Sequence, residues 1–138
     1  MPNFPKRILL VTADLPFVAA FARTLHDYTS ADARSDFNVS WLENGEQAQK
    51  HLGLIKPHVV VVTTKLKGSM PGQRFVGAIE PERRQLMAVV GVYGLAPDDQ
   101  NIWDGAALDG RLPAGNSSDF PALVSAVLSF GIQMSTRE

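Results

Sequence analysis

The residues best placed to do chemistry are hydroxyls and one carboxylate at the predicted ends of buried strands. Thr63 follows the apolar segment 59–62, and Thr12 and Asp14 follow the apolar segment 8–11. A threonine hydroxyl is a poor nucleophile unless a base lies beside it. The sequence offers no nucleophile–base pair here, so these side chains predict hydrogen bonding rather than covalent catalysis.

The composition is that of one globular domain. The chain has 138 residues, of which 45% are hydrophobic and 20% are charged, which is enough apolar material for a continuous core. The net charge of −1 gives no electrostatic reason to expect binding to nucleic acid or to an anionic membrane. The absence of cysteine excludes disulfides and thiolate chemistry, and we expect a cytoplasmic location. Asp14 and Pro16 interrupt the first apolar stretch, which argues against a signal peptide.

Short apolar segments alternate with segments of helical periodicity along the chain. The predicted strands are 7–12, 37–41, 58–63, 86–92 and 106–112. The first predicted helix is capped by Asp14, and its inward residues are Phe17, Val18, Phe21 and Leu25. Three more helices are predicted over 46–55, over 72–79, where Pro81 ends the helix, and over 97–103. The last predicted helix starts at Ser118 or Asp119 and runs at least to Phe130. This alternation predicts a (βα)5 parallel sheet in the flavodoxin-like order 2-1-3-4-5, with helices on both faces. We expect the domain to span 1–131, and 132–138 to be a polar tail or the start of a linker.

Several landmarks in this order resemble one family. They are the first strand at 6–11, the helix start at 44–48, a proline followed by four valines at 57–62, and the pairs 105–106 and 112–113. Together they make the chain similar to the receiver (CheY-like) domain of bacterial response regulators over almost its full length. The resemblance implies a CheY-like fold and a place in a two-component or phosphorelay pathway.

The chain departs from this family at the positions that carry its chemistry. Thr63 stands where the family has its phospho-acceptor aspartate. The family has two acidic residues after its first strand that help to hold Mg²⁺. In this chain their positions are taken by Thr12 and Ala13 if the first strand is used for the alignment, or by Ala13 and Asp14 if the first helix is used. The family's Ser or Thr at the end of the fourth strand is replaced by Tyr93 or, less suitably, by Val92. Its lysine at the end of the fifth strand is replaced by Leu112. Mg²⁺ needs several oxygen ligands and a phosphoryl dianion needs cations, so the resemblance implies a pseudo-receiver without metal, cofactor or enzymatic activity.

Two other interpretations remain open. One is a small flavodoxin-like enzyme or ligand-binding domain, whose site would use Thr12, Asp14, Thr63, Thr64 and Tyr93, with Lys65 and Arg111 as the nearby cations. The other is phosphotransfer through a shifted acceptor or through Asp14. The three histidines, at 26, 51 and 58, show no metal-binding spacing, and we expect them on the surface or on helix faces.

The last predicted helix carries more apolar residues than one buried stripe requires. We expect a candidate interface formed by Leu123, Val127, Leu128 and Phe130, for a protein partner, for the chain's own output domain or for a homodimer. The equally weighted alternative is that Val124, Val127 and Leu128 pack against the sheet while the other apolar residues of this helix cap its hydrophobic edge.

Overall fold

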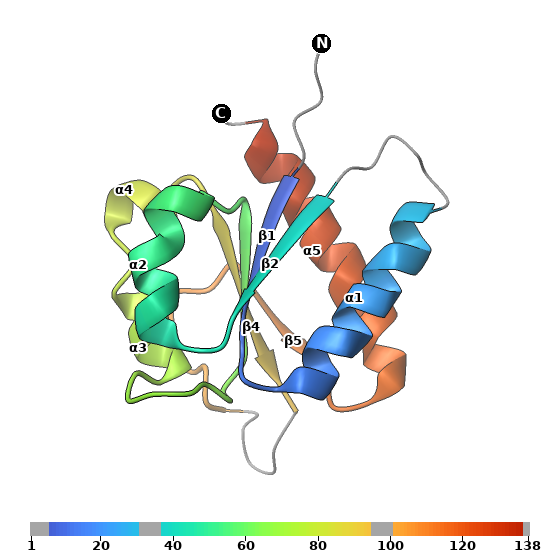
Figure 1. Cartoon of the computed structure of the whole chain (residues 1–138), viewed down its shortest axis with the longest axis horizontal. Helices are drawn as coiled ribbons and strands as arrows, with labels where there is room; N and C mark the ends of the chain where they lie inside the picture. The colour runs from blue at the N-terminus through green and yellow to red at the C-terminus, as the bar shows by residue number, and fades with distance from the viewer. Residues whose placement is uncertain (1–5, 31–36, 95–100, 137–138) are drawn as a thin grey trace.

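Five parallel strands form one sheet in the order β2-β1-β3-β4-β5, seen edge-on in Figure 1. This computed structural model describes residues 6–30, 37–94 and 101–136. The strands are β1 (Lys6–Val11), β2 (Phe37–Leu42), β3 (Val59–Val62), β4 (Ala88–Tyr93) and β5 (Gly110–Pro113). The predicted fold class and strand order are therefore confirmed.

The helices form a layer on each face of the sheet. One layer holds α1 (Leu15–Ser30) and α5 (Phe120–Ser135), and the other holds α2 (Gly45–Ile55), α3 (Gly72–Gly77) and α4 (Pro81–Arg84) (Figure 1). The central strands are apolar on both faces because both faces are covered. In β1, for example, Leu10 packs into the cluster under α1 and α5, whereas Leu9 packs into the cluster under α2 and α3.

Helix ends follow local sequence signals. The side chain of Asn44 accepts hydrogen bonds from the backbone N–H groups of Glu46 and Gln47 and so caps α2. That helix ends where Lys56 adopts a left-handed conformation with a φ of 48°. Pro57 follows and cannot continue a helix, so the chain turns directly into the entry to β3.

The last predicted strand and two predicted helical segments differ from the structure. The strand predicted over 106–112 is the shorter β5, Gly110–Pro113. The segment 72–79 holds a shorter helix, α3, and Pro81 begins a separate helix, α4, rather than only ending one, because proline fits the first turn of a helix. The helix predicted over 97–103 falls partly outside the described residues, and 101–105 is a turn. Trp103 is buried in this turn, and its indole N–H donates to the Val92 carbonyl at 2.9 Å.

The last helix extends beyond Phe130, the minimum end predicted for it, and buries part of the expected interface. Leu123 and Val127 are fully buried in the core, so they cannot form a docking surface, and that part of the prediction is corrected. Leu128 and Phe130 are half-buried and pack against the same cluster. The helix runs past residue 131 to Ser135, because its apolar stripe continues to the buried Met134.

Candidate functional site

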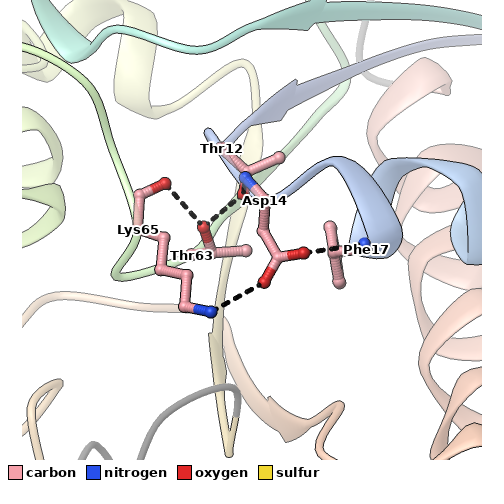
Figure 2. A network of polar contacts seen from close by, with 5 residues as sticks. All are labelled: Thr12, Asp14, Phe17, Thr63 and Lys65. Atoms are coloured by element: carbon pink, nitrogen blue, oxygen red, sulfur yellow. Dashed lines mark hydrogen bonds and ion pairs between the residues drawn. The ribbon is translucent and has the colours of Figure 1, made fainter.

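Two threonine hydroxyls meet at the carboxyl ends of β1 and β3. Val11 and Val62 are paired in the sheet, so the residues that follow them, Thr12 and Thr63, lie side by side. Both are fully buried. The Thr63 hydroxyl donates to the Thr12 hydroxyl with an oxygen–oxygen distance of 2.6 Å (Figure 2). The Thr63 hydroxyl is thus bonded to another hydroxyl rather than to a base that could activate it.

Asp14 holds the start of α1. Its Oδ1 accepts a hydrogen bond from the backbone N–H of Phe17 at 3.0 Å, and its own backbone N–H donates to the Thr12 hydroxyl at 3.0 Å (Figure 2). The first bond satisfies one of the unpaired N–H groups at a helix start. The predicted capping role is therefore confirmed.

Lys65 closes the network from the loop after β3. Its ammonium lies 3.3 Å from Asp14 Oδ2, and the side chain of Asp14 is only 9% exposed (Figure 2). The Lys65 carbonyl accepts from the backbone N–H of Ala13 at 2.6 Å and lies 3.3 Å from the Thr63 hydroxyl. We call Thr12, Asp14, Thr63 and Lys65 the polar rim. Its one carboxylate is paired with a cation of the chain itself.

The sequence indicated Lys65 only as a nearby cation and did not predict its pairing with Asp14. The available signal was topological: both residues follow neighbouring parallel strands by a few positions, and the carboxyl ends of such strands lie at one edge of the sheet. The other cation in the prediction, Arg111, pairs with Asp104 at 2.5 Å.

Tyr93 and Leu112 lie at the ends of β4 and β5 but on opposite faces of the sheet. Tyr93 packs against the cluster under α2 and α3, whereas Leu112 packs against the cluster under α1 and α5. Leu112 thus contributes apolar packing at the position that the resemblance assigns to a lysine. Neither side chain is part of the polar rim.

An open cleft of about 610 Å³ lies beside the polar rim. It is formed by the turn after β1, the start of α1 and the turn between β5 and α5. Asp14 and Lys65 supply its charges, Asn116 and Ser117 supply polar groups, and Phe17 and Phe120 are among its apolar residues. A cleft at this edge is where ligands of open α/β sheets bind.

The histidines are not part of this region. His58 precedes β3, at the opposite end of the strand, where its Nδ1 accepts from the backbone N–H of Arg7 at 2.9 Å. It is 2% exposed, so the expected surface position is wrong for this residue. Within residues 6–30, 37–94 and 101–136, no group of three or more His, Cys, Asp or Glu side chains is arranged to hold a metal ion. No helix in the same ranges is long and apolar enough to cross a membrane.

No family model matches the sequence, and no curated protein matches it. Solved structures do match the fold. The chemotaxis response regulator CheY4 of Vibrio cholerae has 15% sequence identity and a TM-score of 0.68, with 90% of this chain and 99% of that chain covered. The receiver domain of a histidine kinase from Syntrophus aciditrophicus has 17% identity and a TM-score of 0.69, with 90% of each chain covered.

A third matching structure contains a bound metal ion. The receiver domain of the sensor histidine kinase PA1611 from Pseudomonas aeruginosa has 14% identity and a TM-score of 0.62, with 91% of this chain and 99% of that chain covered. Its structure holds a magnesium ion coordinated in the active-site cleft. At these identities the likeness establishes the fold, which is that of response-regulator receiver domains.

Proposed function

We propose that this chain is a receiver-like signalling module of a two-component or phosphorelay-type pathway, and that it acts through protein–protein contact without accepting a phosphoryl group. The observation that carries the proposal is the polar rim, in which each functional side chain is bonded to another part of the chain. In this account Thr63 is a degenerate acceptor position, and Thr12, Ala13 and Asp14 form a degenerate acidic pocket.

Charge balance at the polar rim supports the absence of phosphoryl transfer. Mg²⁺ prefers several oxygen ligands, with carboxylates prominent among them, and the polar rim offers only Asp14, already paired with Lys65. To bind Mg²⁺, that carboxylate would have to give up its ammonium partner or accept a second cation beside it. The magnesium in the cleft of PA1611 is therefore a property that we do not extend to this chain.

The acceptor position supports the same proposal. A phosphoryl group on the Thr63 hydroxyl would add up to two negative charges in a fully buried place. Leu112 brings no ammonium to offset that charge and instead packs into the core. We therefore propose that no residue of this rim takes up phosphate and that the chain is not an enzyme.

A signal must then arrive by contact. We propose a protein partner or the chain's own output domain as the source or target. The half-buried Leu128 and Phe130 on α5 are what remains of the predicted interface, so a homodimer through this helix stays a proposal.

The open cleft favours one alternative function, a small-ligand site. Its volume of about 610 Å³ lies within the range of small-molecule pockets, and its Asp14–Lys65 pair could orient a polar ligand. A thermal-shift screen with small metabolites tests this alternative. A saturable rise in Tm that the variant Lys65→Met abolishes would favour it over a contact module.

Exposure to acetyl phosphate with Mg²⁺, followed by intact-mass measurement, tests the main proposal. A receiver domain with an acceptor aspartate serves as the positive control. We expect the control to gain the mass of one phosphoryl group while this chain keeps its mass. A stoichiometric adduct mapped by peptide analysis to Thr63, Asp14 or another residue of the cleft would overturn the proposal.

A further inference from the structure

The two edge strands of the sheet differ in how they are protected. β5 has only four residues and carries Arg111 and Pro113. A short strand, a charge and a proline are the usual means by which natural sheets prevent pairing at an edge. β2 has six residues, FNVSWL, with neither a charge nor a proline. By these criteria β2 is an edge open to pairing with another strand.

The backbone of β2 presents hydrogen-bonding groups on its outer side. The Leu42 carbonyl accepts a hydrogen bond from the backbone N–H of Thr12. The backbone groups of Leu42 and of every second residue before it in β2 therefore face β1. The N–H and C=O groups of one residue in a parallel strand point to the same side. The backbone groups of Phe37, Val39 and Trp41 therefore point away from the sheet. β2 is the terminal strand of the sheet in the part of the chain that the structure describes.

Two of the side chains at this edge are both apolar and exposed. Val39 and Trp41 are 37% and 39% exposed, and they lie on one face of β2 because strand residues alternate. The other large exposed apolar side chains among the described residues lie on helices or in turns. The exposed apolar residues and the outward backbone groups therefore coincide on one strand, as a strand-pairing surface requires.

We propose that this edge pairs with the β2 edge of a second copy of the chain, antiparallel about a two-fold axis at Ser40. The strand is self-complementary in that register. Val39 of one copy lies opposite Trp41 of the other, and the symmetry repeats the pair. Aromatic and β-branched residues are favourable cross-strand neighbours, and an uncharged strand meets its copy without like-charge repulsion. Both residues of each pair have outward-facing backbone groups, so each pair exchanges two N–H···O=C bonds.

The register makes a geometric prediction at Ser40. Its backbone groups face β1, so Ser40 and its symmetry mate form a non-hydrogen-bonded pair, with Cα atoms about 4.5 Å apart. That separation lies within the range of about 4.4–6.8 Å that a disulfide spans. The chain contains no cysteine, so Ser40→Cys introduces a single thiol that reports on this contact alone.

Mild oxidation of Ser40→Cys tests the register, with Ser129→Cys as the control. Ser129 is exposed on α5, so its thiol reports on the alternative dimer through the last helix. We expect Ser40→Cys to form a covalent dimer much faster than Ser129→Cys does. Equal rates, or faster dimerisation of Ser129→Cys, would overturn the proposal.

Sedimentation of the uncrosslinked chain tests the edge itself. We expect the wild type to dimerise in a concentration series. Val39→Lys should weaken that dimer by about tenfold or more, because it removes the apolar contact with Trp41 and the two-fold axis brings the two lysines to neighbouring diagonal positions on the pairing edges. Leu54→Lys removes an apolar side chain that is 82% exposed on α2 and should leave the dimer unchanged. Circular dichroism checks that both variants fold. A wild type that stays monomeric, or a dimer that Val39→Lys does not weaken, would overturn the proposal.

Discussion

The four valines of β3 and the residues that follow them are continuous in the chain but lie in different environments. The valines are fully buried on both faces of the sheet, and many apolar sequences can fill such a place. The polar rim depends on individual side chains, because each of its bonds requires one donor and one acceptor at a set position. This explains how the fold of receiver domains can be shared at 13% to 17% sequence identity.

The comparison predicts the largest energetic effects in the core. Phe21 is fully buried, with its ring centroid 6.1 Å from that of Phe17. Phe21→Ala should lower the free energy of unfolding by about 3–5 kcal/mol, because it leaves a cavity that the packed sheet cannot fill. Urea denaturation measures this loss. Leu15→Ala, at a residue that is 59% exposed, should change stability by less than about 0.5 kcal/mol. Equal losses in the two variants would contradict the account of the core.

The hydroxyl pair should have the next largest effect. Thr63→Val keeps the shape of the side chain but removes the donor to Thr12, so we expect a loss of about 1–2 kcal/mol in the free energy of unfolding. Thr63→Ser keeps the donor and should retain the bond while losing one methyl group. Amide hydrogen exchange at Thr12 and Asp14 reports on the same bond. Unchanged exchange in Thr63→Val would show that the pair does not hold the polar rim together.

The helix cap should contribute about the same or slightly less. Asp14→Ala removes the acceptor for the Phe17 N–H and should cost about 1 kcal/mol. Asp14→Asn keeps a side-chain oxygen in place and should cost much less, since asparagine also caps helices. Thermal denaturation of both variants measures the difference. If Asn and Ala destabilise equally, the charge of Asp14, rather than its cap, is what the fold uses.

The ion pair should have the smallest effect on stability. The Lys65 side chain is 48% exposed, so water and salt screen its attraction to Asp14. We expect Lys65→Met to change the free energy of unfolding by less than about 0.5 kcal/mol, and a double-mutant cycle with Asp14→Asn to give a coupling below about 1 kcal/mol. A larger coupling energy would mean that the ion pair stabilises the fold, rather than only neutralising the charge of Asp14.

Particular residues show why the fold was predictable and the polar rim only partly so. The buried strands were evident because Ile8 to Val11 and Val59 to Val62 are unbroken apolar runs, a property that each segment carries by itself. The cap at Asp14 was also local, since the helix that it caps begins at the next residue.

The errors fall where a contact joins distant parts of the chain. The pairing of Asp14 with Lys65 joins residues that follow two separate strands, β1 and β3, and its geometry depends on the loops after both strands. Trp103 is buried in a turn, where a helix was predicted, because Gly91 of β4 leaves room for its ring. A Cβ at Gly91 would clash with that ring. Leu123 and Val127 could not be separated from Leu128 and Phe130, because all four are apolar and only the packing against the sheet shows which are covered.

The central claim is that the polar rim binds neither Mg²⁺ nor a phosphoryl group. NMR of its backbone amides tests this most directly, in an isotope-labelled wild-type chain that is titrated with Mg²⁺ and then with beryllofluoride. The account predicts no saturable shift at Thr12, Asp14, Thr63 or Lys65 at either step, because the one carboxylate there is paired with the chain's own ammonium. A saturable shift at these amides that Asp14→Asn abolishes would contradict it, since the polar rim would then hold a metal ion and could support phosphoryl chemistry.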